Sequence, residues 1–315
     1  MNKSNAQFQK ILVTGGAGFV GTHLCRRLVQ DGYQVVTLDL KDPTVAIDGV
    51  EYVRGDVRDA SLLRKLINTT DVVYHLAATV SIPACQKDPV ESYSNNFNAT
   101  LGVLEAIRAK AETTNTKPMP LVFASTAAVY GMKGDDGRAL AEDDVAEEFL
   151  SYYAAQKHAS EKTIELHSRF YAIPATVFRF FNIIGPGQDP SSPYSGVITI
   201  FMNLAKTGKP LLLNGGGHQT RDFISVYDIV DACVTALSLP TEQWNPKPIN
   251  LGTGSVITIR EVAELVRKIN DNRSEILSAP SREGDVTHSR ADVRRGFEAL
   301  GWKAHRTVGD SLSEI

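Results

Sequence analysis

A glycine-rich stretch near the start of the chain restricts its fold more than any other feature. Residues 10–24 read KILVTGGAGFVGTHL, and Gly15, Gly18 and Gly21 follow one another at three-residue spacing. The apolar run before the glycines is typical of a strand buried on both faces of a parallel sheet, and apolar residues recur at helical spacing between the glycines and Gly32. The sequence therefore predicts a strand, a tight turn and a helix in succession.

This arrangement is the context that a dinucleotide-binding loop requires. Glycine allows the backbone to approach a pyrophosphate, and a helix N-terminus offers free N–H groups and the positive end of its dipole. Asp39 ends the next apolar run, about 20 residues past the loop, where a ribose-binding carboxylate is expected. A carboxylate there favours NAD over NADP because it would repel a 2′-phosphate, although Lys41 weakens this preference. An ordinary turn is the alternative, since glycine spacing alone is weak evidence.

The bulk composition excludes several classes of protein. Of 315 residues, 43% are hydrophobic and 22% are charged, and the net charge of −3 is not that of a nucleic-acid-binding protein. The sequence has no apolar run long enough to span a membrane, and residues 1–9 have no apolar signal core. The three cysteines are widely separated without Cys-x-x-Cys spacing, which is typical of reduced, structural residues. We expect a cytoplasmic protein that contacts neither nucleic acid nor membrane.

Segments typical of strands and helices alternate through the first half of the chain, which predicts an α/β fold of the Rossmann type, with a doubly wound parallel sheet. Strands are expected at residues 11–13, 34–39, 50–54, 71–78, 121–125 and 175–181, with helices at 96–110 and 151–170. The alternation breaks up at the glycine- and proline-rich loop 185–193. We expect a first domain over residues 1–180 and a smaller α/β substrate domain over 181–315, with a segment around 223–252 returning to the first.

The stretch 131–148 is rich in acidic residues. Runs of charge of this kind usually lie on a solvated surface, and we prefer that interpretation to a metal site.

A tyrosine and a lysine four residues apart, Tyr153 and Lys157, fall on the helix after the fifth strand. This spacing places both side chains on one face of the helix. A tyrosine acts as a base at neutral pH only if its pKa falls by about three units from about 10, which requires about 4 kcal/mol. A nearby ammonium and a cationic nicotinamide could supply that stabilisation, and Thr126 at the end of the fifth strand could bind the same substrate oxygen. The alternative for the pair alone is an exposed tyrosine and lysine without function.

The glycine loop, the hydroxyl residue after the fifth strand and the Tyr-x-x-x-Lys motif together resemble the extended short-chain dehydrogenase/reductases. The resemblance is greatest to the UDP-hexose 4-epimerases and runs from Ile11 to about Trp302. In that family the motif Ser/Thr-Ala-x-Val-Tyr-Gly carries the catalytic hydroxyl, and residues 126–131 read TAAVYG, with threonine where most members have serine. The resemblance implies tightly bound NAD, a UDP-sugar substrate, and a homodimer in which helices 96–110 and 151–170 form a four-helix bundle.

The resemblance also implies cofactor contacts. Asp56 and Val57 match a pair beside the adenine, and residues 76–78 match a strand end that lies along the cofactor. Asn96 matches the asparagine of an Asn-x-x-Gly-Thr motif, with Ala99 in place of the glycine. The predicted NAD-binding residues are Gly15, Gly18, Phe19, Val20, Asp39, Asp56, Val57, Leu76, Ala77, Ala78, Asn96, Tyr153 and Lys157.

Three further stretches, 179–182 (RFFN), 221–228 (RDFISVYD) and 282–285 (REGD), resemble motifs that bind a nucleotide sugar in this family. Two arginines with forked donors suit the double charge of UDP. The predicted substrate-binding residues are Ser81 and Thr126; Asn182, Arg221 and Arg282 at the phosphates; Leu212 and Asn214 beside the uracil; Asp285 at the ribose; and Val197 and Ser289.

The implied reaction is a transient oxidation of the sugar at C4, with NAD regenerated and no net redox change. Tyr153, as a phenolate, takes the proton of the 4-hydroxyl directly or through Thr126 and later returns it. Lys157 holds the phenolate and the nicotinamide ribose.

The sugar preference is predicted from Ser289, seven residues after Arg282. In the family this position borders the sugar's 2-substituent, and a tyrosine there restricts the pocket to glucose and galactose. A small residue leaves room for an N-acetyl group, as in the epimerases of polysaccharide assembly. We therefore expect UDP-N-acetylglucosamine and UDP-N-acetylgalactosamine as substrates, with UDP-glucose and UDP-galactose weaker.

Other reactions of the same family are the nearest alternatives. Sugar 4,6-dehydratases carry an Asp-Glu pair directly after the catalytic threonine, and UDP-glucuronate decarboxylases carry a glutamate nearby, because both reactions need an extra acid or base. Ala127 and Ala128 occupy those places, which argues against both. A UDP-glucuronate 4-epimerase stays open, and so does a non-catalytic protein that senses NAD.

Overall fold

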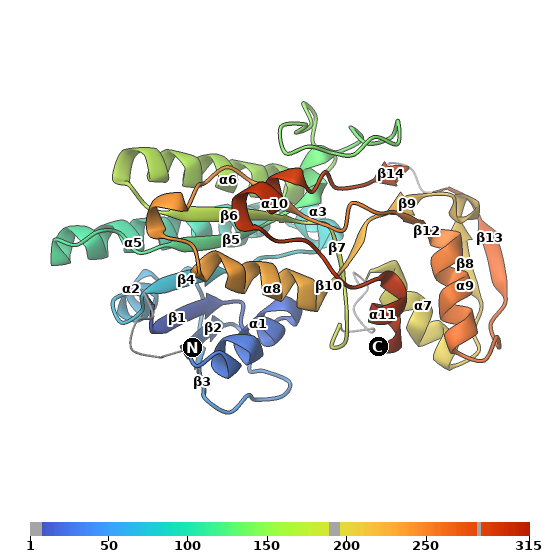
Figure 1. Cartoon of the computed structure of the whole chain (residues 1–315), viewed down its shortest axis with the longest axis horizontal. Helices are drawn as coiled ribbons and strands as arrows, with labels where there is room; N and C mark the ends of the chain where they lie inside the picture. The colour runs from blue at the N-terminus through green and yellow to red at the C-terminus, as the bar shows by residue number, and fades with distance from the viewer. Residues whose placement is uncertain (1–7, 189–195, 282–284) are drawn as a thin grey trace. The chain divides into compact units, whose positions relative to one another are not determined.

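The computed structural model describes residues 8–188, 196–281 and 285–315 (Figure 1). The chain forms two compact units, each assembled from three separate segments. The first unit comprises the chain as far as Thr126, Ser151–Arg179 and Val230–Ile249, and the second comprises Ala127–Leu150, Phe180–Ile229 and Asn250–Ile315. Residues 127–150, which we expected in the first domain, thus group with the second unit, and the segment that returns to the first unit is residues 230–249.

The first unit is built on a seven-stranded sheet in the order β11-β6-β5-β4-β1-β2-β3. The strands of this sheet are β1 (Lys10–Thr14), β2 (Gln34–Asp39), β3 (Val50–Arg54), β4 (Val72–His75), β5 (Leu121–Thr126), β6 (Ala175–Phe180) and β11 (Ile249–Leu251). The first unit ends within β11, at Ile249, and within β6, at Arg179. β1 pairs in parallel with both β2 and β4, so the chain changes direction across the sheet at β1. This confirms the predicted doubly wound fold, whose ligand crevice lies at the carboxyl ends of the strands beside such a reversal.

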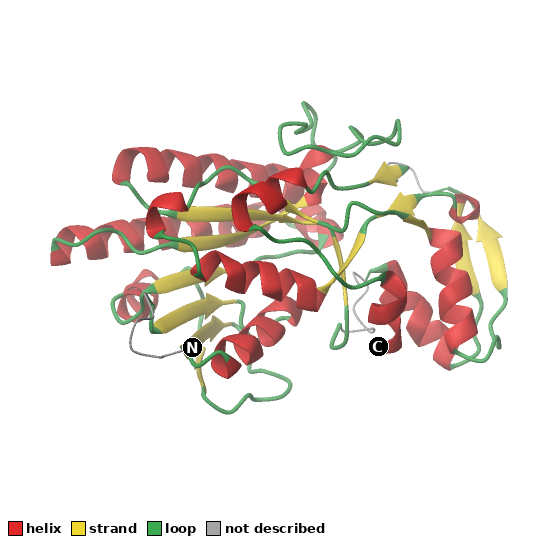
Figure 2. Cartoon of the chain, in the orientation of Figure 1, coloured by secondary structure: helices red, strands yellow, loops and turns green. Residues whose placement is uncertain are grey.

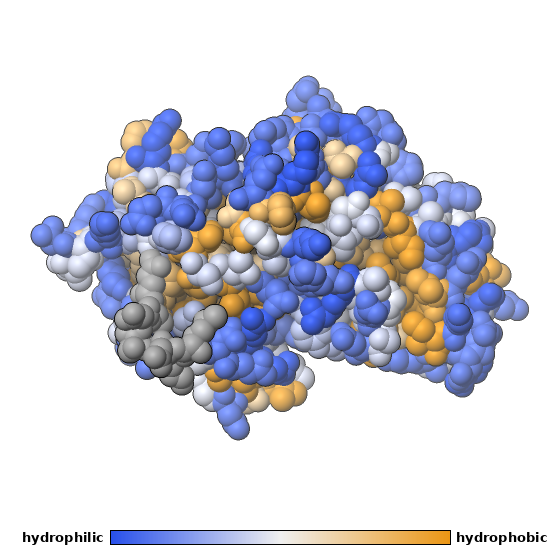
Figure 3. Space-filling view, viewed as in Figure 1, coloured by the Kyte–Doolittle hydropathy of each residue, from blue (hydrophilic) through white to orange (hydrophobic). Residues whose placement is uncertain are grey.

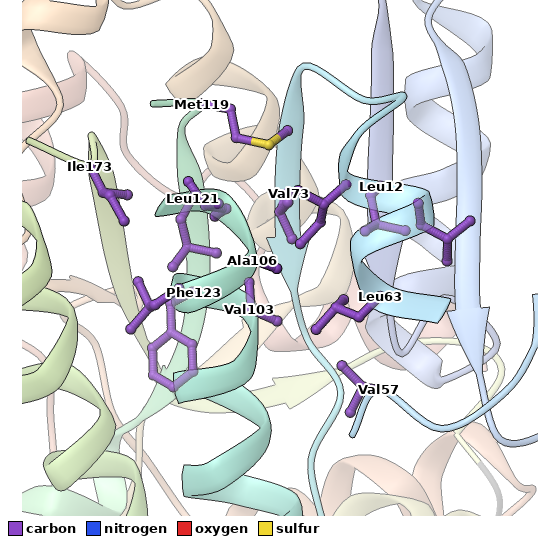
Figure 4. Packing of buried hydrophobic residues seen from close by; sticks show 14 of the residues in the cluster. Leu12, Val57, Leu63, Val73, Val103, Ala106, Met119, Leu121, Phe123 and Ile173 are labelled. Atoms are coloured by element: carbon purple, nitrogen blue, oxygen red, sulfur yellow. The ribbon is translucent and has the colours of Figure 1, made fainter. Parts of the chain in front are cut away.

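Helices cover both faces of this sheet (Figure 2). On one face lie α1 (Phe19–Gln30) and α8 (Val226–Leu237), which are joined by an ion pair between Arg27 and Asp231. On the other lie α2 (Ala60–Ile67), α5 (Ala99–Thr114) and α6 (Tyr152–Tyr171). Figure 4 shows Leu63 of α2 and Val103 of α5 packed among sheet residues such as Leu12 and Val73. These apolar contacts fix the helices that carry the candidate catalytic residues against the sheet.

Short elements connect β4 to α5. They are α3 (Ile82–Lys87), α4 (Pro89–Tyr93) and a π-helical turn over Ser94–Asn98. The predicted helix 96–110 therefore begins inside the π turn, a feature that often marks a functional position. By contrast, α6 begins at Tyr152, because Ser151 precedes it and its hydroxyl accepts a hydrogen bond from Ala154 N at 3.2 Å.

The second unit contains three small sheets. β7 (Asn182–Ile184) pairs with β10 (Phe223–Ser225), and β8 (Leu211–Asn214) pairs with β13 (Ile276–Ala279), both in parallel. β9 (Thr220–Arg221) lies between β12 (Ile257–Thr258) and β14 (His288–Ser289). The helices are α7 (Val197–Lys206), α9 (Ile259–Ile269), α10 (Arg294–Leu300) and α11 (Val308–Ser313). Phe201 of α7, Val262 of α9 and Leu312 of α11 share one buried apolar cluster.

The acid-rich loop 131–148, at the top of the view in Figure 3, presents mainly hydrophilic side chains. Glu142 is an exception to the expected solvated surface, because only 5% of it is exposed. Its Oε1 accepts a hydrogen bond from Asn250 N at 2.9 Å, and burial raises the pKa of the carboxyl group. Glu142 therefore stabilises the interior of the second unit through this hydrogen bond.

Within the described part of the chain, no three side chains of histidine, cysteine, aspartate or glutamate come together as metal ligands. A search of the same residues for a helix with the length and apolar character of a membrane span finds none.

Candidate active site

The glycine loop between β1 and α1 has the shape of a cradle. Gly15 has a φ of +76°, and a Cβ at this position would lie 2.7 Å from Ala77 N. A Cβ on Gly21 would lie 2.2 Å from the carbonyl oxygen of Gly15. Gly18 precedes the helix, whose first turn carries no acidic residue in the described chain, so its N–H groups suit an anion. Phe19 and Val20 form that first turn.

Asp39 lies beside this loop at the end of β2. Its Oδ2 accepts a hydrogen bond from Ala17 N at 3.1 Å, and its Oδ1 accepts one from Lys41 N at 3.0 Å. Each oxygen retains a lone pair, so the carboxylate still suits a ribose hydroxyl. The glycine cradle and this acid together fit the pyrophosphate and ribose of a dinucleotide such as NAD.

Asp56 and Val57, the residues expected at the adenine, both interact with other residues of the first unit. Asp56 binds the guanidinium of Arg58 at 2.6 Å, and this hydrogen bond lowers the pKa of Asp56. Val57 is buried in the apolar core of the first unit. Of the two residues predicted at the adenine, the half-buried Asp56 therefore presents a polar side chain and Val57 does not.

The segment after β4 is fixed by the buried side chain of Asn96. Asn96 accepts a hydrogen bond from Thr79 N at 2.7 Å and donates to Thr79 O at 3.1 Å and to Gln156 Oε1 at 2.8 Å. Its amide thus holds the backbone that follows Leu76, Ala77 and Ala78, which are half-buried. Contact of Asn96 with the cofactor stays a prediction.

His75, which the sequence analysis did not single out, completes this arrangement. Thr100 Oγ1 donates to Asn96 O at 2.7 Å, so its oxygen accepts from His75 Nε2–H at 3.1 Å. His75 Nδ1 then accepts from Thr14 Oγ1 at 2.7 Å, which assigns a neutral ring. Burial, with Lys157 nearby, lowers the pKa of His75 to about 3. The ring thus ties β1 and α5 together at the end of β4.

The structure brings the three predicted catalytic residues together. Tyr153 and Lys157 lie one turn apart on α6, and Thr126 ends β5 and shares a side-chain hydrogen bond with Tyr153. The ammonium group of Lys157 donates to Ala124 O at 2.8 Å and lies 4.6 Å from the ring centre of Phe123. The lysine is buried and the tyrosine is half-buried.

The pKa values of this pair are shifted by burial. Burial raises the pKa of Tyr153 to about 12, against the opposing effect of the Thr126 hydrogen bond. Burial lowers the pKa of Lys157 to about 7, although the charge of Glu161 works in the other direction. The Tyr153 phenolate therefore needs more positive charge than the buried lysine provides, as a cationic nicotinamide would supply.

In the second unit, Arg221 and Asp285 form an ion pair, with NH2 2.8 Å from Oδ1. Gln219, which the sequence analysis missed, donates to Asp285 Oδ2 at 3.1 Å and to Asn214 O at 3.0 Å. Burial lowers the pKa of Arg221, and the charge of Asp285 opposes that effect. Arg221, Asp285 and Asn214 are thus brought together, whereas Arg282 lies outside the described residues.

Asp222 fixes the neighbouring segments of the second unit. Its carboxylate accepts hydrogen bonds from Thr253 N at 2.8 Å, Gly254 N at 2.9 Å and Ala291 N at 3.1 Å. Its backbone accepts from Asn182 Nδ2 at 2.9 Å and donates to Ser289 O at 2.9 Å. Asn182 and Ser289 are therefore anchored to the strand that follows Arg221.

The remaining predicted substrate residues lie on three different elements. Ser81 is buried in the first unit, where its hydroxyl accepts from Ala84 N at 2.9 Å and caps α3. In the second unit, Val197 begins α7, and Leu212 of β8 is 54% exposed. Contact of these three side chains with a sugar nucleotide stays a prediction.

Comparison with known proteins gives consistent relatives. The model of the NAD dependent epimerase/dehydratase family matches residues 11–252. A putative UDP-glucose 4-epimerase of Methanocaldococcus jannaschii is 31% identical over 310 residues, which cover 97% of this chain and 96% of that protein. A UDP-N-acetyl-alpha-D-glucosaminuronate decarboxylase of Bacillus cytotoxicus is 32% identical over 284 residues, which cover 86% and 84%.

Among solved structures, the UDP-N-acetylglucosamine 4-epimerase from Methanobrevibacter ruminantium M1, in complex with UDP-N-acetylmuramic acid, superposes with a TM-score of 0.85. The two sequences are 29% identical, and the match covers 97% of this chain and 96% of that one.

Proposed function

Because the chain belongs to the NAD dependent epimerase/dehydratase family, we propose that it interconverts UDP-N-acetylglucosamine and UDP-N-acetylgalactosamine by inversion at C4. The observation that carries this proposal is the group Thr126, Tyr153 and Lys157 at the carboxyl end of β5. At family level the chain is an NAD-dependent enzyme of UDP-sugars, and the particular sugar is the new part of the proposal.

The chain's own residues have separate tasks in this reaction. NAD, when bound, would supply reversible hydride transfer at C4 of the sugar, and the glycine loop and Asp39 would hold it. Tyr153 removes the proton of the 4-hydroxyl and later returns it. Thr126 hydrogen-bonds Tyr153, so that both hydroxyl groups can hydrogen-bond the 4-oxygen of the sugar. Lys157 stabilises the phenolate by its charge. Arg221 of the second unit binds the diphosphate.

The proposed preference for N-acetylated sugars rests on Ser289. Ser289 pairs with Arg221 across strands β14 and β9, so the small side chain is held next to the proposed phosphate ligand. Its backbone is fixed by Asp222, as described above. A small, fixed residue there leaves volume for an acetamido group where a larger side chain would fill it.

The decarboxylase relative makes a second reaction worth testing. Decarboxylation of a 4-keto uronate needs a carboxylate pocket and an additional acid or base. Residues 127 and 128, in the short helix Ala127–Tyr130, are both alanine and supply neither. Epimerisation therefore suits the described site better, and UDP-glucuronate serves as the discriminating substrate.

The test is incubation of the purified protein with UDP-N-acetylglucosamine, without added cofactor, followed by NMR of the anomeric protons. We expect signals of UDP-N-acetylgalactosamine, slower conversion of UDP-glucose, and no conversion by a Tyr153→Phe variant. Release of carbon dioxide or a pentose product from UDP-glucuronate would instead support decarboxylation. Absence of any product from all three sugars, with NAD bound, would support a non-catalytic protein.

We further propose that the protein is a homodimer formed through α5 and α6. The apolar residues Leu166, Phe170 and Tyr171 are exposed on α6 within the described chain. Such side chains on a surface helix favour association. Light scattering after gel filtration would give twice the mass of 34.3 kDa, and Phe170→Glu would reduce that mass to one chain.

A further inference from the structure

Three consecutive residues of β5 bind three residues of α6 that are spaced one helical turn apart. Thr126 hydrogen-bonds Tyr153, and Ala124 O accepts from Lys157 Nζ at 2.8 Å. Between them, the hydroxyl of Ser125 donates to Glu161. Tyr153, Lys157 and Glu161 are therefore all hydrogen-bonded to the C-terminal end of β5. Glu161 is held in place in the same way as the catalytic pair.

Glu161 is held by a buried cation as well as by Ser125. Arg179 of β6 donates from Nε to Oε1 at 2.9 Å and from NH2 to Oε2 at 2.6 Å. Both side chains of this pair are only 2% exposed. His158 Nδ1 lies 3.4 Å from Oε2 on the other side. A carboxylate with this many donors stays ionised, and the pKa of Glu161 is lowered to about 2.

The charge of Glu161 acts on Lys157, its neighbour one turn earlier on the same helix face. Glu161 on α6 and Cys85 in α3 act on the charge of Lys157, which in turn acts on His75 at the end of β4. Tyr153 lies one turn before Lys157 on α6, and Arg179 of β6 is the cation paired with Glu161. His75 is neutral, and burial raises the pKa of the Cys85 thiol. Among these groups of the described chain, Glu161 carries the permanent negative charge.

We propose that Glu161, clamped by Arg179 and Ser125, is a positioning residue that keeps the proton on Lys157 and thereby leaves Tyr153 free to act as the base. This inference rests on the proposed function. The Tyr153–Lys157 pair with one proton exists either as phenol and amine or as phenolate and ammonium. A fixed negative charge closer to the lysine than to the tyrosine favours the second arrangement, which is the reactive one.

The first test measures Lys157 directly and requires no turnover. The lysine Cε signals of the isotope-labelled protein, as purified with its cofactor, are followed by NMR against pH. The signal of Lys157 is identified by its loss in Lys157→Met. In Glu161→Gln we expect the midpoint of Lys157 to fall by at least about half a pH unit. An unchanged midpoint would overturn the proposal.

The second test is the pH dependence of kcat/KM with UDP-N-acetylglucosamine. Glu161→Gln should move the acidic limb to lower pH and reduce the rate on the plateau about tenfold. A purely structural role would reduce the rate without moving the limb. Ser125→Ala keeps both charges and should move the limb less, and it replaces Glu161→Gln if that variant does not fold.

The matched control is Glu165→Gln, the same change one turn further along α6. Glu165 is exposed and paired with Lys162, so neither the Lys157 midpoint nor the rate profile should move. If no sugar nucleotide is converted by any protein, but the Lys157 midpoint still falls in Glu161→Gln, the charge relation stands and the proposed function is wrong.

Discussion

Arg221 and Asp285 neutralise each other in the second unit, with 2.8 Å between guanidinium and carboxylate. From the sequence, Arg221 is expected at the diphosphate of UDP and Asp285 at its ribose. If the diphosphate binds as proposed, the guanidinium has to interact with a second anion while the carboxylate remains beside it. Asp285 limits how strongly a single phosphate can attract Arg221, and Gln219 holds Asp285 in place.

Loss of the Arg221 charge should weaken nucleotide binding without disabling the chemistry. For Arg221→Met we expect the Kd for UDP to rise by about 10- to 100-fold, since charge-assisted hydrogen bonds contribute about 1.5–3 kcal/mol. Isothermal titration with UDP measures this. Arg273→Met is the control, because Arg273 is exposed and paired only locally with Asp271. Equal affinity of the two variants would remove Arg221 from the binding site.

The identity of residue 289 should decide which sugar is used. Ser289→Tyr is expected to reduce kcat/KM for UDP-N-acetylglucosamine at least about tenfold while UDP-glucose is converted as before, because the larger ring fills the acetamido volume. The ratio of the two rates, measured by NMR on one preparation, is the readout. Equal turnover of the N-acetylated substrate by variant and parent would contradict the proposed preference.

The glycine cradle should not tolerate a methyl group. In Gly21→Ala the new Cβ would meet the carbonyl oxygen of Gly15 at 2.2 Å, so the loop has to move away from α1. We expect the variant to purify without NAD, as judged by the absorbance of the cofactor released on denaturation. Gly102→Ala is the control, since its Cβ would have an ordinary contact of 3.9 Å with Leu63 in the same unit.

His75 should make the first unit less stable in mild acid. Its pKa is lowered to about 3 in the folded chain and is about 6.5 when unfolded, so the unfolded chain binds more protons between these values. This contribution to stability is complete well above about pH 6.5 and is lost as the pH falls through that value, by about 1.4 kcal/mol between about pH 7.5 and 5.5. The free energy of unfolding of His75→Asn, measured with urea at each pH, should fall less over this range than that of the parent.

Tryptophan fluorescence can be used to follow unfolding of the first unit separately from the second. Of the two tryptophans, Trp244 lies in the first unit and Trp302 in the second, so a Trp302→Phe background isolates the signal. His305→Asn, a change at an exposed histidine, should retain the parent pH dependence. A decline in His75→Asn equal to that of the parent would show that His75 is not the group responsible.

Local sequence patterns were sufficient to predict most of the first unit. β1, β2, β3 and α1 follow from apolar runs and glycine spacing, whereas β4 is shorter than the predicted strand 71–78 and covers Val72–His75. The pair Tyr153 and Lys157 follows from helical periodicity, which needs no knowledge of distant contacts.

What could not be predicted depends on contacts between distant segments. Glu161 gains its role from Ser125 and Arg179, which arrive on two different strands, and nothing in its own neighbourhood of the sequence marks it. Glu142 belongs to an acid-rich stretch, but the N–H of Asn250 draws it inside. Gln219 likewise depends on Asp285, 66 residues further along the chain.

Because the two units alternate along the chain in six segments, this arrangement also determines when each unit has all its residues during synthesis. Residues 230–249 belong to the first unit but follow most of the second along the chain. The nascent chain therefore cannot finish its nucleotide-binding half until roughly four-fifths of it has left the ribosome, and the two halves must mature almost together. A chain truncated before Ile249 would consequently contain neither unit complete. Thr126 and Tyr153, although only 27 residues apart, are separated by a segment of the other unit.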